Sequence, residues 1–239
     1  MKYAIVTGAS TGIGREVSIE LAKNNFKVGL VGKNLDALIE TKKIIEKNNG
    51  EAKIYECDLS EIRDINEFIE KIKDETDHVD LIANIAGIWH GKDSVFAGID
   101  FEKFQENVLI ETMDVGIMAP MLLVNKLLPL MTGGDVINLS GTFENGGKGW
   151  LPYYVSKRAI EDFTIGLADE LKDKNIKVNC VSPSDTATES YKKFFPQYID
   201  ESIDPKEIAK QFIKIINSEE TGKVFVVKKG KNNAEGFHK

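Results

Sequence analysis

The chain has 239 residues, which is enough for one large domain or two small ones with a sizeable core. Hydrophobic residues make up 42% of it and charged residues 29%, the composition of an ordinary globular protein. Its net charge of −7 argues against a nucleic-acid-binding protein and against a basic surface for membrane binding.

The apolar residues and cysteines narrow the class of protein further. No apolar stretch reaches the roughly 18–20 residues that a membrane-spanning helix requires. The apolar run that follows Met1 is also shorter than that of a signal peptide. The two cysteines, Cys57 and Cys180, lie far apart and are expected to be reduced, as in a cytoplasmic protein. No spacing of histidines, cysteines and acids suggests a metal site.

In chain order, short β-branched apolar runs alternate with longer amphipathic ones. The short runs lack polar alternation, as expected of parallel strands that are covered on both faces. Seven of them are predicted to be strands: Tyr3–Val6, Lys27–Val31, Ala52–Cys57, Asp80–Asn84, Asp135–Ser140, Lys177–Ser182 and Lys223–Val227.

The longer runs have the apolar spacing and the end signals of helices. Ser60 is expected to cap one helix, Asp204 followed by Pro205 begins another, and Gly50 marks a stop. Four helices are predicted between the strands: Arg15–Asn25, Asn34–Gly50, Ser60–Glu75 and Asp204–Asn217.

Strand and helix alternate about seven times, which predicts an α/β fold with one doubly wound, mostly parallel, seven-stranded sheet and helices on both faces. No linker, repeat or low-complexity segment appears, so residues 1–239 are expected to form a single domain. The polar tail, residues 230–239, is expected to be frayed.

The first strand runs directly into the glycine-rich sequence "TGASTGIG", Thr7–Gly14, and then into a helix. A turn this tight needs the backbone freedom of glycine. The missing side chains let a pyrophosphate approach the backbone amides at the start of the helix. A plain tight turn is the alternative, but the position between first strand and first helix favours a dinucleotide site.

The spacing T-G-x-x-x-G-x-G resembles that of the short-chain dehydrogenase/reductase family, and further family motifs follow along nearly the whole chain. The resemblance implies a Rossmann fold that binds a nicotinamide dinucleotide. "NIAG" is similar to the family's N-N-A-G, with Ile85 replacing the second asparagine, and "PSDTAT" is similar to P-G-x-x-x-T, with Ser184 replacing glycine. The implied cofactor-binding residues are Gly8, Ser10, Thr11, Gly12, Ile13, Gly14, Asp58, Leu59, Asn84, Ala86, Gly87, Tyr153, Lys157, Pro183 and Thr188.

The end of the second strand, "LVGKN", bears on the choice of cofactor. In dinucleotide folds that bind NAD, an acid here usually holds the ribose 2′-hydroxyl, but the nearest acid is Asp36, inside the next helix. Lys33 stands where NADP-binding family members often carry arginine, and a cation can pair with the extra phosphate. We therefore expect NADP, with NAD less favoured. A solvated surface lysine is the other interpretation.

The stretch "LPYYVSKRA" contains the candidate acid. Tyr153 and Tyr154 precede Lys157 by four and three residues, and both spacings bring side chains together on a helix. The family pattern Y-x-x-x-K matches Tyr153 and Lys157, which implies that this tyrosine is the acid/base. A nearby ammonium lowers the pKa of a phenol, whose ordinary value is about 10, and so favours proton transfer near neutral pH.

A third hydroxyl usually orients the substrate carbonyl in this family. Ser140 lies past the fifth predicted strand and 13 residues before Tyr153, and we expect it to take this role. Many members carry two serines here and use the second, whose position is Gly141, so Thr142 is the other hydroxyl within reach.

One further position departs from the family pattern. The context D-V-N-x-x-A-P appears here as "DVGIMAP", so Gly116 replaces an asparagine that supports a water linked to the lysine. The gap could admit a water, leave room for substrate or weaken catalysis.

The region expected to close over a substrate follows the sixth strand. Residues 189–202 are predicted to form a lid, in which Phe194, Phe195 and Tyr198 could line an apolar surface or could serve packing or oligomer contacts. The loop Trp89–Phe96 is expected to contribute to specificity, because it follows the carboxyl end of a strand.

The resemblance therefore implies an NADP-dependent oxidoreductase that interconverts a carbonyl and an alcohol on a small molecule, and that forms a homodimer or homotetramer by analogy. One alternative is a dinucleotide-binding sensor or partner-binding protein with little catalysis. Another is epimerisation or dehydration, which leaves the product redox-neutral.

Overall fold

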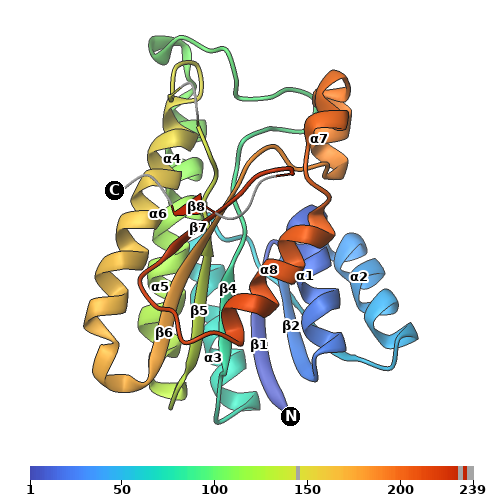
Figure 1. Cartoon of the computed structure of the whole chain (residues 1–239), viewed down its shortest axis with the longest axis vertical. Helices are drawn as coiled ribbons and strands as arrows, with labels where there is room; N and C mark the ends of the chain where they lie inside the picture. The colour runs from blue at the N-terminus through green and yellow to red at the C-terminus, as the bar shows by residue number, and fades with distance from the viewer. Residues whose placement is uncertain (144–145, 231–233, 236–239) are drawn as a thin grey trace.

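A single sheet of eight strands organises the chain (Figure 1). The computed structural model describes residues 1–143, 146–230 and 234–235. The strand order is β3-β2-β1-β4-β5-β6-β7-β8, and all pairs from β3 to β7 are parallel. The parallel strands are β1 Lys2–Thr7, β2 Phe26–Gly32, β3 Glu51–Glu56, β4 Leu81–Asn84, β5 Gly134–Leu139, β6 Ile176–Pro183 and β7 Val224–Val227.

The seven predicted strands are confirmed, but the sheet contains one more. The short strand β8, Ala234–Glu235, pairs antiparallel with β7. The segment expected to be frayed includes these two residues, whose backbone pairs with Phe225 and Val226 of β7. The rest of the predicted tail after Gly230 lies outside the described residues.

Helices cover both faces of the sheet, as predicted for a doubly wound fold. Figure 1 shows α1, α2 and α8 on one face and α3 to α6 on the other. Each face has its own apolar core, one including Leu21, Leu38 and Phe212 and the other including Phe68 and Leu123. The helices are α1 Gly12–Lys23, α2 Leu35–Lys47, α3 Ile62–Glu75, α4 Glu106–Met113, α5 Ala119–Leu127, α6 Leu151–Glu170, α7 Glu189–Phe194 and α8 Pro205–Ile216.

The helix ends follow local capping chemistry, with two corrections. Asp204 caps α8 by accepting a hydrogen bond from the Lys206 amide, as predicted. Ser60 does not cap α3, because its hydroxyl and amide both bind the Asp58 carboxylate, at 2.7 and 3.0 Å. At the end of α2, Asn49 rather than Gly50 takes the left-handed conformation, with φ 60°.

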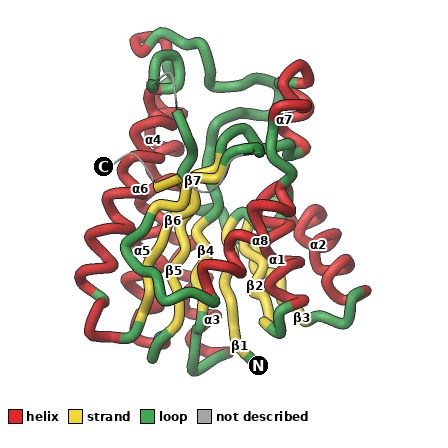
Figure 2. Tube along the Cα trace, in the orientation of Figure 1, coloured by secondary structure: helices red, strands yellow, loops and turns green. Residues whose placement is uncertain are grey.

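The carboxyl ends of the strands meet at one edge, where ligands bind in such sheets. Figure 2 shows α7 standing beyond this edge, apart from the two helical layers. Thr7, at the end of β1, accepts hydrogen bonds from the amides of Ile85 and Ala86 at 2.9 and 3.2 Å. The glycine loop and the segment after β4 are thereby held together.

The stretch Glu106–Leu130 combines α4, a π-helical turn at Asp114–Met118, α5 and a final short turn. By length and composition alone it is apolar enough to cross a membrane, although half of its apolar window is buried in the protein itself. A helix that packs on a protein core passes the same test.

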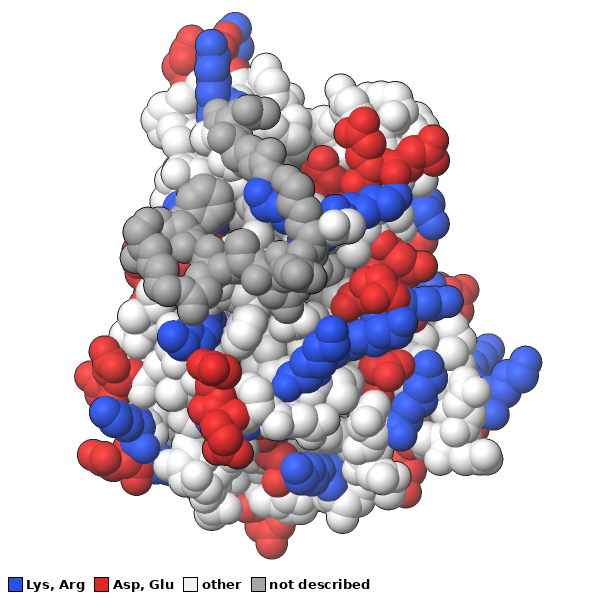
Figure 3. Space-filling view, viewed as in Figure 1, with Lys and Arg blue, Asp and Glu red and all other residues white. Residues whose placement is uncertain are grey.

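On the face shown in Figure 3, acidic and basic side chains are interspersed.

Candidate active site

The glycine loop has the tight geometry that the sequence predicts. A Cβ on Gly14 would lie 2.1 Å from the carbonyl oxygen of Gly8, so only glycine allows the first turn of α1 to approach β1 this closely. Gly12, the first residue of α1, has φ 55°, in the left-handed region. Thr11 precedes it in extended conformation, without a side-chain cap on the helix.

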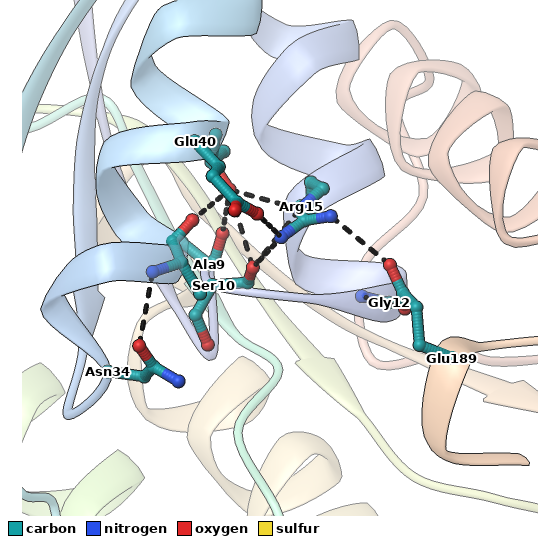
Figure 4. A network of polar contacts seen from close by, with 9 residues as sticks. Ala9, Ser10, Gly12, Arg15, Asn34, Glu40 and Glu189 are labelled. Carbon is teal, nitrogen blue, oxygen red and sulfur yellow. Dashed lines mark hydrogen bonds and ion pairs between the residues drawn. The ribbon is translucent and has the colours of Figure 1, made fainter. Parts of the chain in front are cut away.

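An anionic group already lies at this loop. The Glu189 carboxylate accepts a hydrogen bond from the Gly12 amide at 3.0 Å and forms an ion pair with the Arg15 guanidinium at 3.2 Å. Figure 4 shows Arg15 between the carboxylates of Glu189 and Glu40. Arg15 also donates to the Ser10 carbonyl at 2.6 Å. The carboxylate oxygens of Glu189 stand where a phosphate oxygen would be bound, so these residues fit an anionic cofactor.

Two predicted cofactor residues meet at the ends of β2 and β3. The Lys33 ammonium lies 3.7 Å from the Asp58 carboxylate, and the lysine side chain is 67% exposed. Burial by itself would raise the pKa of Asp58, but hydrogen bonds from Ser60 and the charge of Lys33 outweigh it and lower that pKa. Asp58 is therefore ionised at neutral pH, and its neighbour Leu59 is buried in the core.

Several implied cofactor residues have structural contacts of their own. The Asn84 side-chain Nδ2 donates a hydrogen bond to the Asn138 Oδ1 at 2.9 Å, in the buried interior. Pro183 is buried and its carbonyl accepts from the Thr142 amide. Thr188 caps α7 and its methyl group packs against Gly12. Ile13 packs against the core on the α1 side. Among the described residues, the Asn84 side-chain oxygen has no hydrogen-bond partner, so Asn84 keeps an acceptor for a further contact.

The candidate catalytic pair is brought together on α6. The Lys157 ammonium lies 5.4 Å from the centre of the Tyr153 ring and donates a hydrogen bond to the Leu139 carbonyl at 2.7 Å. Gly87 closes the site from the β4 side, because a Cβ there would lie 3.3 Å from the Lys157 nitrogen and 3.7 Å from the Tyr153 ring. Tyr153 and Lys157 are thus neighbours of the segment Asn84–Gly87.

Burial controls the charges of this pair. It lowers the pKa of Lys157 to about 8, although the neighbouring Cys180 and Glu161 act in the opposite direction. It also raises the pKa of Tyr153 above its ordinary value. The prediction that the ammonium lowers the pKa of Tyr153 is therefore wrong for this structure, because burial of the phenol raises that pKa.

The Ser140 hydroxyl, predicted to orient a substrate carbonyl, is engaged in the interior of the protein. Its hydroxyl is buried, 2.6 Å from the Glu161 carboxylate and 2.9 Å from the Lys157 carbonyl oxygen. Both partners lie at or beyond Lys157 along α6, whereas Tyr153 lies one turn before it. Glu161 is fully buried and also pairs with Arg158 at 2.9 Å. Ser140 thus connects the end of β5 to α6, and its role toward a substrate stays a prediction.

Gly116 has a packing role that the sequence left open. A Cβ at this position would lie 2.8 Å from the Ser156 Cβ, so the helix that contains Gly116 touches α6 directly. Ser156 lies against the Gly116 backbone where a side chain would begin, and the consequence of the absent asparagine for catalysis stays a prediction. The local π-helical turn accompanies this close contact.

Aromatic side chains surround Tyr153. Its ring centre lies 5.8 Å from that of Phe143 and 6.4 Å from that of Trp150. Tyr154 packs on Phe143, at 5.1 Å, with the Arg158 guanidinium over its ring. This second tyrosine therefore belongs to the wall of the site.

Sequence reasoning missed two acids of this site. Glu161 follows Lys157 by four residues, a helical spacing that could have revealed it. Glu189 follows Thr188 and carries no sequence signal of its contact with Gly12. In the part of the chain that the structure describes, no three histidine, cysteine or acidic side chains are placed to hold a metal ion.

Comparisons with known proteins agree with this architecture. The sequence model of the short chain dehydrogenase family matches residues 2–199. An uncharacterised oxidoreductase of Staphylococcus saprophyticus is 30% identical over 226 residues, covering 89% of each chain. The fatty acyl-CoA reductase of Acinetobacter baylyi is 31% identical over 187 residues, and the match spans 75% of this chain but 61% of that longer protein. The solved structure of the angucycline C-6 ketoreductase LanV with bound NADP is 26% identical, with a TM-score of 0.84 and coverage of 94% and 93%.

Proposed function

The chain belongs to the short-chain dehydrogenase/reductase family of NAD(P)-dependent oxidoreductases, and we propose that it interconverts a carbonyl and an alcohol on a small molecule with NADP as cofactor. The observation that carries the proposal is the placement of Tyr153 and Lys157 together, against Gly87. Two similar proteins, a fatty acyl-CoA reductase and a ketoreductase with bound NADP, support carbonyl chemistry and this cofactor.

The glycine loop and the ends of β2 and β3 hold the cofactor in this proposal. The amide of Gly12 and the charge of Arg15 bind the pyrophosphate, as they bind the Glu189 carboxylate here. Lys33 pairs with the 2′-phosphate, for which its exposure leaves it accessible. When bound, the nicotinamide supplies or accepts the hydride.

The protein's own chemistry is proton transfer and orientation. The Tyr153 hydroxyl gives its proton to the substrate oxygen during reduction and takes it back during oxidation. The Lys157 ammonium stabilises the phenolate that forms, and the Leu139 carbonyl holds that ammonium in place. Thr142 replaces Ser140 as the hydroxyl that we assign to the substrate carbonyl, because the Ser140 hydroxyl is committed to the interior.

Replacement of Tyr153 by phenylalanine tests the acid/base role. We expect NADPH-dependent turnover of carbonyl substrates to disappear while NADPH still binds with nearly unchanged affinity. Unchanged turnover would refute the role.

The NADP preference is tested by titrating NADPH and NADH into the wild type and into Lys33→Ala. We expect the preference for NADPH to shrink in the variant, and tighter binding of NADH by the wild type would overturn it.

We also propose that residues 189–202 close over the site and that the protein forms a homo-oligomer. α7 and the following 3-10 helix Pro196–Glu201 lie beyond the carboxyl edge of the sheet, where a lid would lie. Exposed apolar side chains on α4 to α6 support contact with a second copy: Ile110, Met118, Met121, Leu151 and Val155.

A further inference from the structure

A continuous group of aromatic rings lies around the candidate acid. The rings come from the segment after β4, the segment after β5, the start of α6 and α7, and successive ring centres lie between 5.1 and 6.5 Å apart. We call this group the aromatic cluster; its members are Trp89, Phe143, Trp150, Tyr153, Tyr154, Tyr191, Phe194 and Phe195.

The aromatic cluster does not serve the folding core. None of its members belongs to either core cluster of the two sheet faces, and every one is half-buried. Both tryptophans of the chain are among them. Large apolar rings that stay partly exposed and gather beside a reacting group are typical of a ligand site.

The contacts within the cluster run from Tyr153 to the lid. The Trp150 ring lies 6.4 Å from Tyr153 and 6.1 Å from Phe195, and Phe195 in turn stacks on Trp89 at 6.2 Å with an interplanar angle of 25°. A molecule whose carbonyl oxygen lies at the Tyr153 hydroxyl therefore has its substituents among these rings.

The same contacts hold α7 against the body of the protein. A ligand that enters must separate some rings of α7, such as Phe195, from Trp89 and Trp150. A flat aromatic ligand can replace the lost ring–ring contacts with ring–ring contacts of its own. A puckered aliphatic ligand of equal size cannot.

We propose that the substrate of this enzyme is a planar aromatic carbonyl compound, which stacks against Trp150, Trp89 and Phe195. This inference rests on the proposed function. In the reaction, the carbonyl carbon accepts a hydride from reduced NADP, the C=O π bond breaks, and the oxygen takes the Tyr153 proton. The products are an alcohol, which is secondary when the substrate is a ketone, and NADP⁺, and Tyr153 regains its proton from solvent.

A matched pair of ketones tests the substrate class. Acetophenone and cyclohexyl methyl ketone have the same carbon skeleton, but only the first carries a flat ring. We expect kcat/KM with NADPH to be about tenfold higher for acetophenone, as one good ring–ring contact implies. Equal values for the two ketones, or a preference for the cyclohexyl compound, would overturn the inference while leaving the proposed function intact.

Variants locate the preference in the aromatic cluster. Phe195→Leu and, separately, Trp150→Leu are expected to reduce the tenfold ratio to nearly one. The matched control is Phe101→Leu, because Phe101 is 58% exposed and makes no ring contact with the described members of the cluster; its ratio should stay at the wild-type value. A ratio that survives both cluster variants would contradict the proposal.

Binding without turnover separates this inference from the proposed function. Calorimetric titration of both ketones into the Tyr153→Phe variant with NADPH measures affinity alone. Tighter binding of acetophenone, by about tenfold, supports stacking on the aromatic cluster independently of turnover, whereas acetophenone that binds more tightly but is not reduced by the wild type would overturn its class as the substrate. Equal affinities would overturn the inference.

Discussion

Two hydroxyls lie past β5, those of Ser140 and Thr142, and variants can separate the roles that we propose for them. Ser140→Ala removes a hydrogen bond from the buried Glu161 carboxylate, which should lower the free energy of unfolding by about 1–3 kcal/mol. We expect its kcat to remain within about twofold of the wild type. Thr142→Val should lower kcat by about tenfold or more at nearly unchanged stability, if its hydroxyl binds the developing oxyanion.

Urea unfolding and steady-state kinetics of both variants distinguish the assignments. A large loss of kcat in Ser140→Ala, with no loss of stability, would restore the role that the sequence predicted for this serine. Spacing alone selects Ser140, but the direction of its hydroxyl is fixed by Glu161, which lies 21 residues further along the chain. The number of residues between Ser140 and Tyr153 therefore could not reveal the contact between Ser140 and Glu161.

The charge of Lys157 predicts a pH dependence of reduction. Burial lowers the pKa of this ammonium to about 8, so the folded protein loses the charge as the pH rises through that value. Without it the Tyr153 phenolate is less stabilised and the tyrosine is a weaker acid. We expect kcat/KM for ketone reduction to be level between about pH 6 and 7 and to fall above about pH 8.

Loss of the Lys157 proton affects stability in the opposite direction to activity: the free energy of unfolding increases where kcat/KM falls. The unfolded chain keeps the lysine proton up to about pH 10.5, so between pH 8 and 10.5 unfolding takes up a proton and the free energy of unfolding rises with pH. Lys157→Met serves as the control: it should be inactive, and the contribution to that rise should disappear. A kcat/KM that stays level to pH 10 would contradict the account.

At the scale of elements, the contact between α7 and α1 opposes cofactor binding. The Glu189 carboxylate occupies the Gly12 amide and the Arg15 guanidinium to which we assign the pyrophosphate, so this side chain must leave them before the cofactor binds there. Glu189→Gln should therefore lower the Kd for NADPH, by about two- to fivefold for a contact this exposed. The enhancement of NADPH fluorescence on binding provides the measurement.

A matched variant on the other side of Arg15 serves as the control. Glu40 forms a similar ion pair with the same guanidinium, at 3.3 Å, but no hydrogen bond to Gly12. Glu40→Gln should change the affinity for NADPH less than Glu189→Gln does. Equal effects of the two substitutions would mean that charge near Arg15 matters and that the contact with Gly12 does not.

The close contact between the Gly116 helix and α6 could not be predicted from the sequence. The missing asparagine is evident from "DVGIMAP", but whether the space is empty depends on how closely two helices approach. Ser156 lies against the Gly116 backbone, because the π-helical turn brings that backbone against α6. Helix–helix distance depends on tertiary packing, which one sequence does not reveal.

At the scale of the whole molecule, the exposed apolar side chains of α4 to α6 predict self-association. Met121, on α5, is 41% exposed, and Leu35, on the opposite layer, is 42% exposed. Met121→Glu should lower the mass measured by light scattering after size exclusion, whereas Leu35→Glu should not. A wild-type protein that elutes as a monomer would refute the prediction.

The sheet itself was largely predictable from sequence. Buried parallel strands need continuous β-branched runs such as those in β1, β5 and β6, and these stand out against the amphipathic helices. β8 could not be predicted, because an antiparallel edge of two residues forms through its backbone and leaves no apolar pattern. The glycine loop and the Tyr153–Lys157 pair were predictable because their chemistry fixes residue types at short spacings. The Glu189 contact spans 177 residues and has no such signature.

The central claim is that this protein transfers a hydride between NADP and a carbonyl, with Tyr153 supplying the proton. Its most direct test is reduction of acetophenone with NADPH deuterated on the transferable position of nicotinamide C4, followed by mass spectrometry of the alcohol. The account predicts one deuterium on the carbinol carbon with the wild type and no alcohol with Tyr153→Phe. Alcohol formed equally by Tyr153→Phe, or a product without deuterium, would contradict it.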